Sequence, residues 1–172
     1  MYKRQFVKLV KEGFYDDLLF HRVIDGFMIQ GGDPQSKDAA PGQPLGSGGP
    51  GYLLDNEIGA PHFRGCLAAA RTGGPSNPDK KSSGSQFYVV DGNIQNRAAL
   101  NSMAQRKGYA YNEEQIAKYE SIGGTPMLDM DYTVFGELVS GHEVIDQIAT
   151  VAKDRSDRPT TDVKMKIRMS SK

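Results

Sequence analysis

The chain has 172 residues, a length typical of one domain with a sizeable hydrophobic core. Its 21 basic and 21 acidic side chains cancel, so the composition does not indicate the basic surface that nucleic acid or an anionic membrane attracts. No apolar run approaches the roughly 20 residues of a membrane-spanning helix, and the first residues lack a signal-peptide pattern. We therefore expect a cytoplasmic protein; a periplasmic or lipid-anchored one is the alternative if the native N-terminus is longer.

The first predicted element is a helix over residues 2–11. Phe6, Leu9, Val10 and Phe14 recur at helical spacing, with lysine and arginine between them. Gly13 is suited to end the helix.

Residues 19–24 and 27–30 are predicted to form two short strands joined at Asp25-Gly26, a dipeptide that favours a hairpin turn. The hairpin would bring Arg22 close to Phe27, Met28 and Gln30, so that a cation lies beside an apolar surface. These residues alone favour a plainer interpretation, a solvated arginine and a buried core, because long charged side chains are mostly exposed.

The middle of the chain is predicted to alternate between loops and short strands. Residues 31–51 are rich in glycine and proline, but the phosphate-binding pattern GxxxxGK[ST] is missing. Residues 52–58 look extended, and surface charge explains Asp55 and Glu57 better than a hydrolase pair. Residues 66–70 and 86–90 are apolar strands around a polar loop at 71–83. Cys66, the single cysteine, is expected to be buried and inert and excludes an internal disulfide.

Two helices are predicted at residues 96–106 and 112–122, the second with Asn112 and Gln115 as an N-terminal capping pair. Their apolar faces are narrow. We interpret segment 91–124 as a surface decoration, with a partner-binding or pocket-rim role as the alternative.

The last predicted elements are a strand at 132–139, a helix that begins with a capping box at 140–143, and a half-buried strand at 163–169. The helix should turn Val144, Ile145, Ile148 and Ala149 inward. Many short strands with few helices favour a mostly β fold, either a barrel or a sandwich.

Four blocks of the sequence together resemble the cyclophilin family of peptidyl-prolyl cis–trans isomerases. They are FHRVIDGFMIQGGDP, GCLAAAR, GSQFYVV and TPMLDMDYTVFGELVSGHEVIDQI, in the order of the family. The resemblance implies an antiparallel β-barrel with capping helices and a single domain over residues 1–172, with 91–124 as a helical insertion. Two strands normally precede the first helix, and only Met1 stands in their place. We therefore expect the barrel to be incomplete.

The resemblance also implies the activity, rotation about X–Pro peptide bonds of proline-containing polypeptides, which assists protein folding. The reaction needs no cofactor or metal, and the spacing of His21, His62 and His142 matches no metal motif. The sequence also lacks the GxSxG pattern, which in many hydrolases carries the serine nucleophile of acyl transfer. The alternative is a non-catalytic module of the same fold that binds proline peptides. In either case we expect a monomer that does not bind nucleic acid.

By the same resemblance, Arg22 is the catalytic donor. The substrate-binding residues implied by it are Phe27, Met28, Gln30, Ala70, Arg71, Gln86, Tyr88, Met127, Leu128 and Tyr132. Four of them depart from the best-known eukaryotic pattern: Arg71 replaces asparagine, Tyr88 phenylalanine, Met127 tryptophan and Tyr132 histidine. Loss of the tryptophan argues against strong cyclosporin binding, because that indole contacts the drug in the family.

Overall fold

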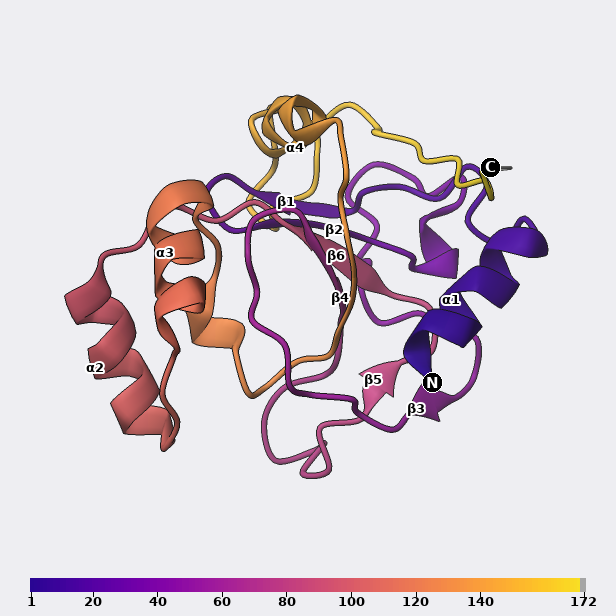
Figure 1. Cartoon of the computed structure of the whole chain (residues 1–172). Helices are drawn as coiled ribbons and strands as arrows, with labels where there is room; N and C mark the ends of the chain where they lie inside the picture. The colour runs from indigo at the N-terminus through magenta and orange to yellow at the C-terminus, as the bar shows by residue number, and fades with distance from the viewer. Residues whose placement is uncertain (171–172) are drawn as a thin grey trace.

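The computed structural model describes residues 1–170 and centres on an antiparallel five-stranded sheet in the order β1-β2-β6-β4-β7 (Figure 1). The strands are β1 (Arg22–Ile24), β2 (Met28–Gly31), β3 (Leu53–Leu54), β4 (Cys66–Ala69), β5 (Ser82–Ser83), β6 (Phe87–Val90) and β7 (Val134–Glu137). The helices are α1 (Tyr2–Lys11), α2 (Arg97–Lys107), α3 (Glu113–Ile122) and α4 (His142–Ala149), with short 3-10 turns η1 (Pro34–Ser36) and η2 (Pro126–Leu128). β3 and β5 form a separate two-stranded ribbon.

The predicted hairpin is confirmed by the pairing of β1 with β2. Arg22 lies opposite Gln30 and Ile24 opposite Met28, and Gly26 takes the left-handed conformation with φ of 67°. Glycine adopts this conformation without the steric cost that a Cβ would add. The hairpin therefore fixes how the two strands align.

Alternate residues of these strands supply two separate hydrophobic clusters. Val23, Ile29, Phe87 and Val89 pack with α1 and α4 on one face of the sheet. The opposite face belongs to a second cluster around Met28, which includes residues of α2 and α3. In Figure 1 α1 and α4 stand apart from α2 and α3, which lie next to each other.

The strands do not close into the predicted barrel. Within residues 1–170, β1 and β7 remain the two edges of an open sheet. At the β1 edge, the Val23 amide donates to the carbonyl of Asp157, which lies outside the named strands, at 2.9 Å. In the part of the chain described, no helix is long and apolar enough to cross a lipid bilayer.

Several predicted element ends are wrong. α4 has Gly141 at its N-cap with no side-chain hydrogen bond, so the expected capping box at 140–143 does not form. The predicted strand at 163–169 is reduced to a bridge between Leu19 and Lys164, although Met165 is buried as the alternation indicated. Val144 is 46% exposed and does not turn inward.

The two helices of segment 91–124, called the insertion from here on, form where they were predicted. The Asn96 side chain accepts from the Ala99 amide at 2.9 Å and caps α2, and Asn112 and Gln115 form the expected capping box of α3. These caps satisfy amides that have no partner within the helix.

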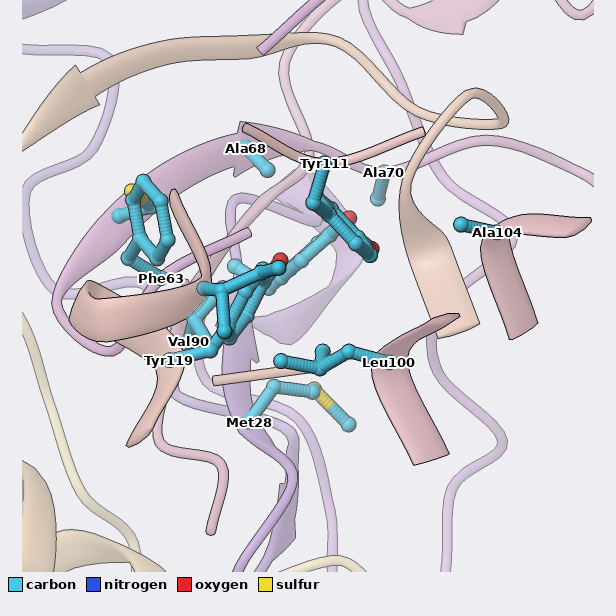
Figure 2. Close-up of a cluster of buried hydrophobic side chains, with 12 residues drawn as sticks. Met28, Phe63, Ala68, Ala70, Val90, Leu100, Ala104, Tyr111 and Tyr119 are labelled. Carbon is cyan, nitrogen blue, oxygen red and sulfur yellow. The ribbon is translucent and has the colours of Figure 1, made fainter. Parts of the chain in front are cut away.

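The insertion is not a surface decoration. Leu100 of α2 and Tyr119 of α3 are both fully buried, and Ala104 is 2% exposed. Figure 2 shows their side chains facing the cluster that contains Met28 and Val90. The narrow apolar faces of the two helices did not indicate this burial in the sequence. A few fully buried side chains are enough to join the helices to the core.

We predict that Leu100→Ala lowers the free energy of unfolding by about 2–5 kcal/mol, since it removes a fully buried side chain and leaves a cavity. Ile94→Ala, in the same insertion but 69% exposed, should change it by about 0.5 kcal/mol or less. Urea denaturation followed by circular dichroism measures both. Equal effects of the two substitutions would contradict the burial of the insertion.

Candidate active site

A row of four residues crosses the sheet from β1 to β4. Arg22 lies opposite Gln30, Gln30 opposite Tyr88, and Tyr88 opposite Ala68. Directly opposite residues of antiparallel strands project on the same face of a sheet. The register thus brings Arg22, Gln30 and Tyr88 together from three strands.

The Arg22 side chain is 43% exposed and lines a cavity of about 590 Å³, together with Gln30 and Arg71. Its one acidic neighbour in the described chain is Asp157, whose Oδ2 lies 3.7 Å from Arg22 Nε. An exposed ion pair of this kind contributes roughly 0–1 kcal/mol. The guanidinium can therefore exchange this carboxylate for another acceptor at little cost.

Two glutamines fix the wall beside Arg22. Gln86 Nε2 donates to the carbonyls of Gly46 at 2.9 Å and Gly48 at 2.7 Å, and Gln86 Oε1 accepts from Gln30 Nε2 at 3.1 Å. The side-chain amide of Gln30 is thus oriented by Gln86. A second cavity, of about 700 Å³, is lined by both glutamines, Ala70 and Arg71.

The apolar side of the site is built on buried Met28 and Tyr88, which are 2% and 4% exposed. Half-buried Phe27, Leu128 and Tyr132 pack against the same cluster. Met127 is 48% exposed. The predicted residues Phe27, Met28, Tyr88, Leu128 and Tyr132 therefore share one hydrophobic cluster, of which Met28 and Tyr88 form the buried part.

Tyr88 carries a hydroxyl that a phenylalanine in its place would lack. That oxygen is buried and has no hydrogen-bond partner among residues 1–170. Burial raises the pKa of Tyr88 far above its usual range, and the neighbouring Tyr132 and Asp129 act in the same direction. The Tyr88 side chain is therefore a neutral, buried aromatic group at any physiological pH.

Arg71 joins the two cavities. Its guanidinium lies 4.5 Å from the centre of the Tyr132 ring, and its Nε donates to the Asp131 carbonyl at 2.8 Å. The Ala70 peptide groups are already engaged, since the amide donates to Gln86 and the carbonyl accepts from Ser83. The peptide groups of Arg71 have no such partner in the described structure, so they are the ones available to an extended ligand.

Several residues of the site were missed from the sequence. Asp157 pairs with Arg22, and Gly46 and Gly48 hold Gln86, yet each comes from a loop far from its partner in the chain. No local pattern could have indicated these contacts. Within the described chain, no three histidine, cysteine or acidic side chains gather as a metal site would require.

Cys66 is 5% exposed, and burial raises the pKa of its thiol to about 11. A thiol with so high a pKa is a poor nucleophile at neutral pH. The prediction of a buried and unreactive cysteine is confirmed.

Comparison with known proteins identifies the class. Residues 1–168 match the family model described as cyclophilin type peptidyl-prolyl cis-trans isomerase/CLD. A protein of Staphylococcus haemolyticus is 38% identical over 164 residues, and one of Staphylococcus saprophyticus is 34% identical over 163. Both are provisionally named peptidyl-prolyl cis-trans isomerases, and each match covers 92% of this chain and 74% of the relative.

Solved structures agree with this class. A cyclophilin-type peptidyl-prolyl cis-trans isomerase of Cryptosporidium parvum, crystallised in the presence of the dipeptide Ala-Pro, is 25% identical with a TM-score of 0.63, and the match covers 98% of this chain and 84% of that one. Another crystal structure of a Cryptosporidium parvum cyclophilin gives a TM-score of 0.62 at 25% identity, with 95% of this chain and 78% of that one covered. The chain belongs to the cyclophilin-type peptidyl-prolyl cis-trans isomerase family, as its four sequence blocks predicted.

His21, which lines the cavity of Arg22, yields a prediction about pH. It is 4% exposed, and neither ring nitrogen has a partner in the described residues. Burial lowers the pKa of His21 to about 4; Asp33 opposes this shift, and Arg22 and Arg158 add to it. Since an unfolded histidine titrates near pH 6.5, the unfolded chain binds the proton first as the pH falls.

The free energy of unfolding should therefore fall by about 3 kcal/mol through this residue as the pH drops from about 6.5 to 4. In His21→Gln that contribution should disappear, whereas the exposed His142→Gln should retain it. Denaturant unfolding at a series of pH values measures the difference. An identical pH slope for wild type and His21→Gln would show that His21 is not held neutral.

Proposed function

We propose that the chain accelerates rotation about X–Pro peptide bonds with Arg22 as the catalytic donor. The observation that carries this proposal is the row from Arg22 through Gln30 to Tyr88, which sets a 43% exposed guanidinium on the same face as an apolar cluster. The family of the chain supports the same activity and does not favour a module that only binds.

The chemistry that the site must perform is purely conformational. Rotation about the C–N bond faces a barrier of about 18–20 kcal/mol, because resonance gives that bond partial double-bond character. When the bond twists, the proline nitrogen becomes pyramidal and gains a lone pair. A donor that meets this lone pair stabilises the twisted amide more than either planar form, which is the condition for catalysis. No covalent step and no cofactor is required.

Arginine suits this role because its guanidinium is always charged and offers several N–H donors in a rigid fork. The guanidinium of Arg22 is held by one weak ion pair with Asp157, at 3.7 Å, so it can turn toward a bound substrate. In our proposal the proline ring packs against Phe27 and Leu128, the half-buried members of the cluster, with Met28 and Tyr88 beneath them.

The rest of the substrate is an extended chain that crosses Gln30 and Arg71. We propose that the peptide groups of Arg71 and the side-chain amide of Gln30 bind its backbone. The side chain of Gln86 holds that of Gln30 in place. Ala70, Met127 and Tyr132 complete the rim. The roles of Arg71, Gln30 and the rim residues are transferred from the family, and Ala70 contributes only its place on the rim because its own peptide groups are paired.

We also propose a single domain over residues 1–172 and a cytoplasmic monomer that does not bind nucleic acid. Weak cyclosporin binding, inferred from Met127 in place of tryptophan, belongs with these proposals. The substrates that we propose are proline-containing segments of unfolded or flexible chains.

We predict that Arg22→Ala reduces catalysed isomerisation of a proline tetrapeptide at least about tenfold, equivalent to about 1.4 kcal/mol of transition-state stabilisation. Arg22→Lys, which keeps the charge but loses the fork, should also be impaired. Arg97→Ala removes an arginine from the exposed surface of the insertion and should leave the rate unchanged. Full activity of Arg22→Ala with native circular dichroism would remove Arg22 from the mechanism.

Two-dimensional exchange NMR on the same peptide separates the enzyme from a binding module. An isomerase accelerates the exchange between cis and trans signals, whereas a binder only shifts the peaks. We expect acceleration with the wild-type chain, and the dipeptide Ala-Pro is a suitable smaller ligand for the titration because a related cyclophilin was crystallised in its presence.

A further inference from the structure

Residues Met127–Asp131, here called the rim segment, are held by an unusual set of donors. Lys107 Nζ donates to the carbonyls of Met127 and Asp129, both at 2.7 Å. Lys80 Nζ donates to the Met130 carbonyl at 3.1 Å, and Arg71 Nε to the Asp131 carbonyl at 2.8 Å. Four backbone carbonyls of one short segment thus accept from three cationic side chains.

The Asp131 carboxylate strengthens this arrangement. One of its oxygens accepts from Lys107 at 2.6 Å and the other from Lys80 at 2.7 Å. Burial alone would raise the pKa of Asp131, yet the hydrogen bonds and charges of Lys107 and Lys80 hold it below its usual value. Both lysines therefore face a permanent negative charge at neutral pH.

Asp129 anchors the same segment from the inside. It is 3% exposed and accepts from the His62 amide and from His62 Nδ1, each at 2.8 Å. Its other oxygen accepts from the hydroxyls of Tyr111 and Tyr119, both of which belong to the insertion. A buried carboxylate is stable only with such a full set of donors, so the insertion and the rim segment depend on each other.

The backbone of the rim segment needs this support. Met130 has φ of 64°, a left-handed conformation that costs energy for any residue with a Cβ. The cationic side chains oppose its relaxation by binding the carbonyls on either side of it. The apolar residues Met127 and Leu128 belong to this segment, which ends at Asp131, directly before Tyr132 of the site.

We infer that the insertion positions the substrate-binding rim, and that Lys107, at the end of α2, is the positioning residue through which it acts. This inference rests on the proposed function, because it assigns the rim segment to the substrate. Lys107 itself does not touch the proline nitrogen. It sets where Met127 and Leu128 lie, so its loss should weaken binding of the substrate more than it slows rotation in the bound state.

The test compares Lys107→Met with Arg106→Met. Arg106 is the preceding residue of α2, and its side chain makes one hydrogen bond in the described chain, to Ser102 of the same helix, so this substitution removes the same charge without touching the rim segment. NMR titration with a proline tetrapeptide gives the Kd, and exchange NMR at saturation gives the rate of rotation in the complex. We expect at least a threefold rise in Kd for Lys107→Met, a smaller change in the bound rate, and wild-type values for Arg106→Met.

Asp131→Asn serves as the second variant, because it removes the charge on which both lysines converge while keeping the shape of the side chain. Asp131→Asn should also raise the Kd. In the variant that carries both substitutions, the loss of binding free energy should be smaller than the sum of the two single losses, since both remove one shared interaction. Backbone amide shifts of Leu128 should move in Lys107→Met and not in Arg106→Met.

Unchanged Kd in both Lys107→Met and Asp131→Asn would overturn the inference. Failure of the proposed function looks different: a wild-type chain that binds the peptide without accelerating exchange would contradict catalysis, and the Kd comparison would still decide the role of Lys107. A wild-type chain that does not bind the peptide would overturn both.

Discussion

The register of three short strands is the constraint on which the site depends. A strand that slips by one residue turns every side chain to the other face. Val23 is fully buried and Ile29 is 3% exposed in the cluster beneath α1 and α4, so a slipped β1 or β2 would place Arg22 or Gln30 in that core. Burial of these apolar neighbours thus keeps the guanidinium on the opposite face. The positions of Arg22 and Gln30 are therefore determined by the packing of Val23 and Ile29 on the other side of the sheet.

The two faces of the sheet are covered unequally, and this leaves room for a site. α1, α4 and the C-terminal segment pack over one face. On the other, the insertion covers the part around Met28 and Val90, as Figure 2 shows, whereas the cavities begin at Gln30, Gln86 and Arg71. The proposed active surface therefore lies at the boundary between a packed region and an open one, where an apolar cluster meets polar groups. Such a boundary suits a ligand that is itself a proline ring on a polar backbone.

Much of this could be predicted from the sequence, and the limits have physical causes. The hairpin at Asp25-Gly26, helix α1 and the caps of α2 and α3 depend on local preferences, which the sequence displays directly. The residues gathered at the site followed from the family resemblance. The partners of those residues did not, because Asp157, Gly46 and Lys107 meet them only through tertiary folding. The capping box at 140–143 failed for a local reason: Gly141, in the αL conformation, is the N-cap of α4, and Ser140 lies before it.

The insertion stabilises the backbone of the rim segment. A glycine at the turn of the rim segment would adopt a positive φ at no cost, and Met130 cannot. The chain meets this cost with contacts: a buried carboxylate with four donors on one side and two lysines on the other. Charge-assisted hydrogen bonds are short and directional, so they fix the carbonyls of the segment more tightly than apolar packing would. Arg22, by contrast, is held by one weak ion pair. In the proposed mechanism, the donor that must follow the twisting amide is thus weakly held, whereas the rim segment is held by several charge-assisted hydrogen bonds.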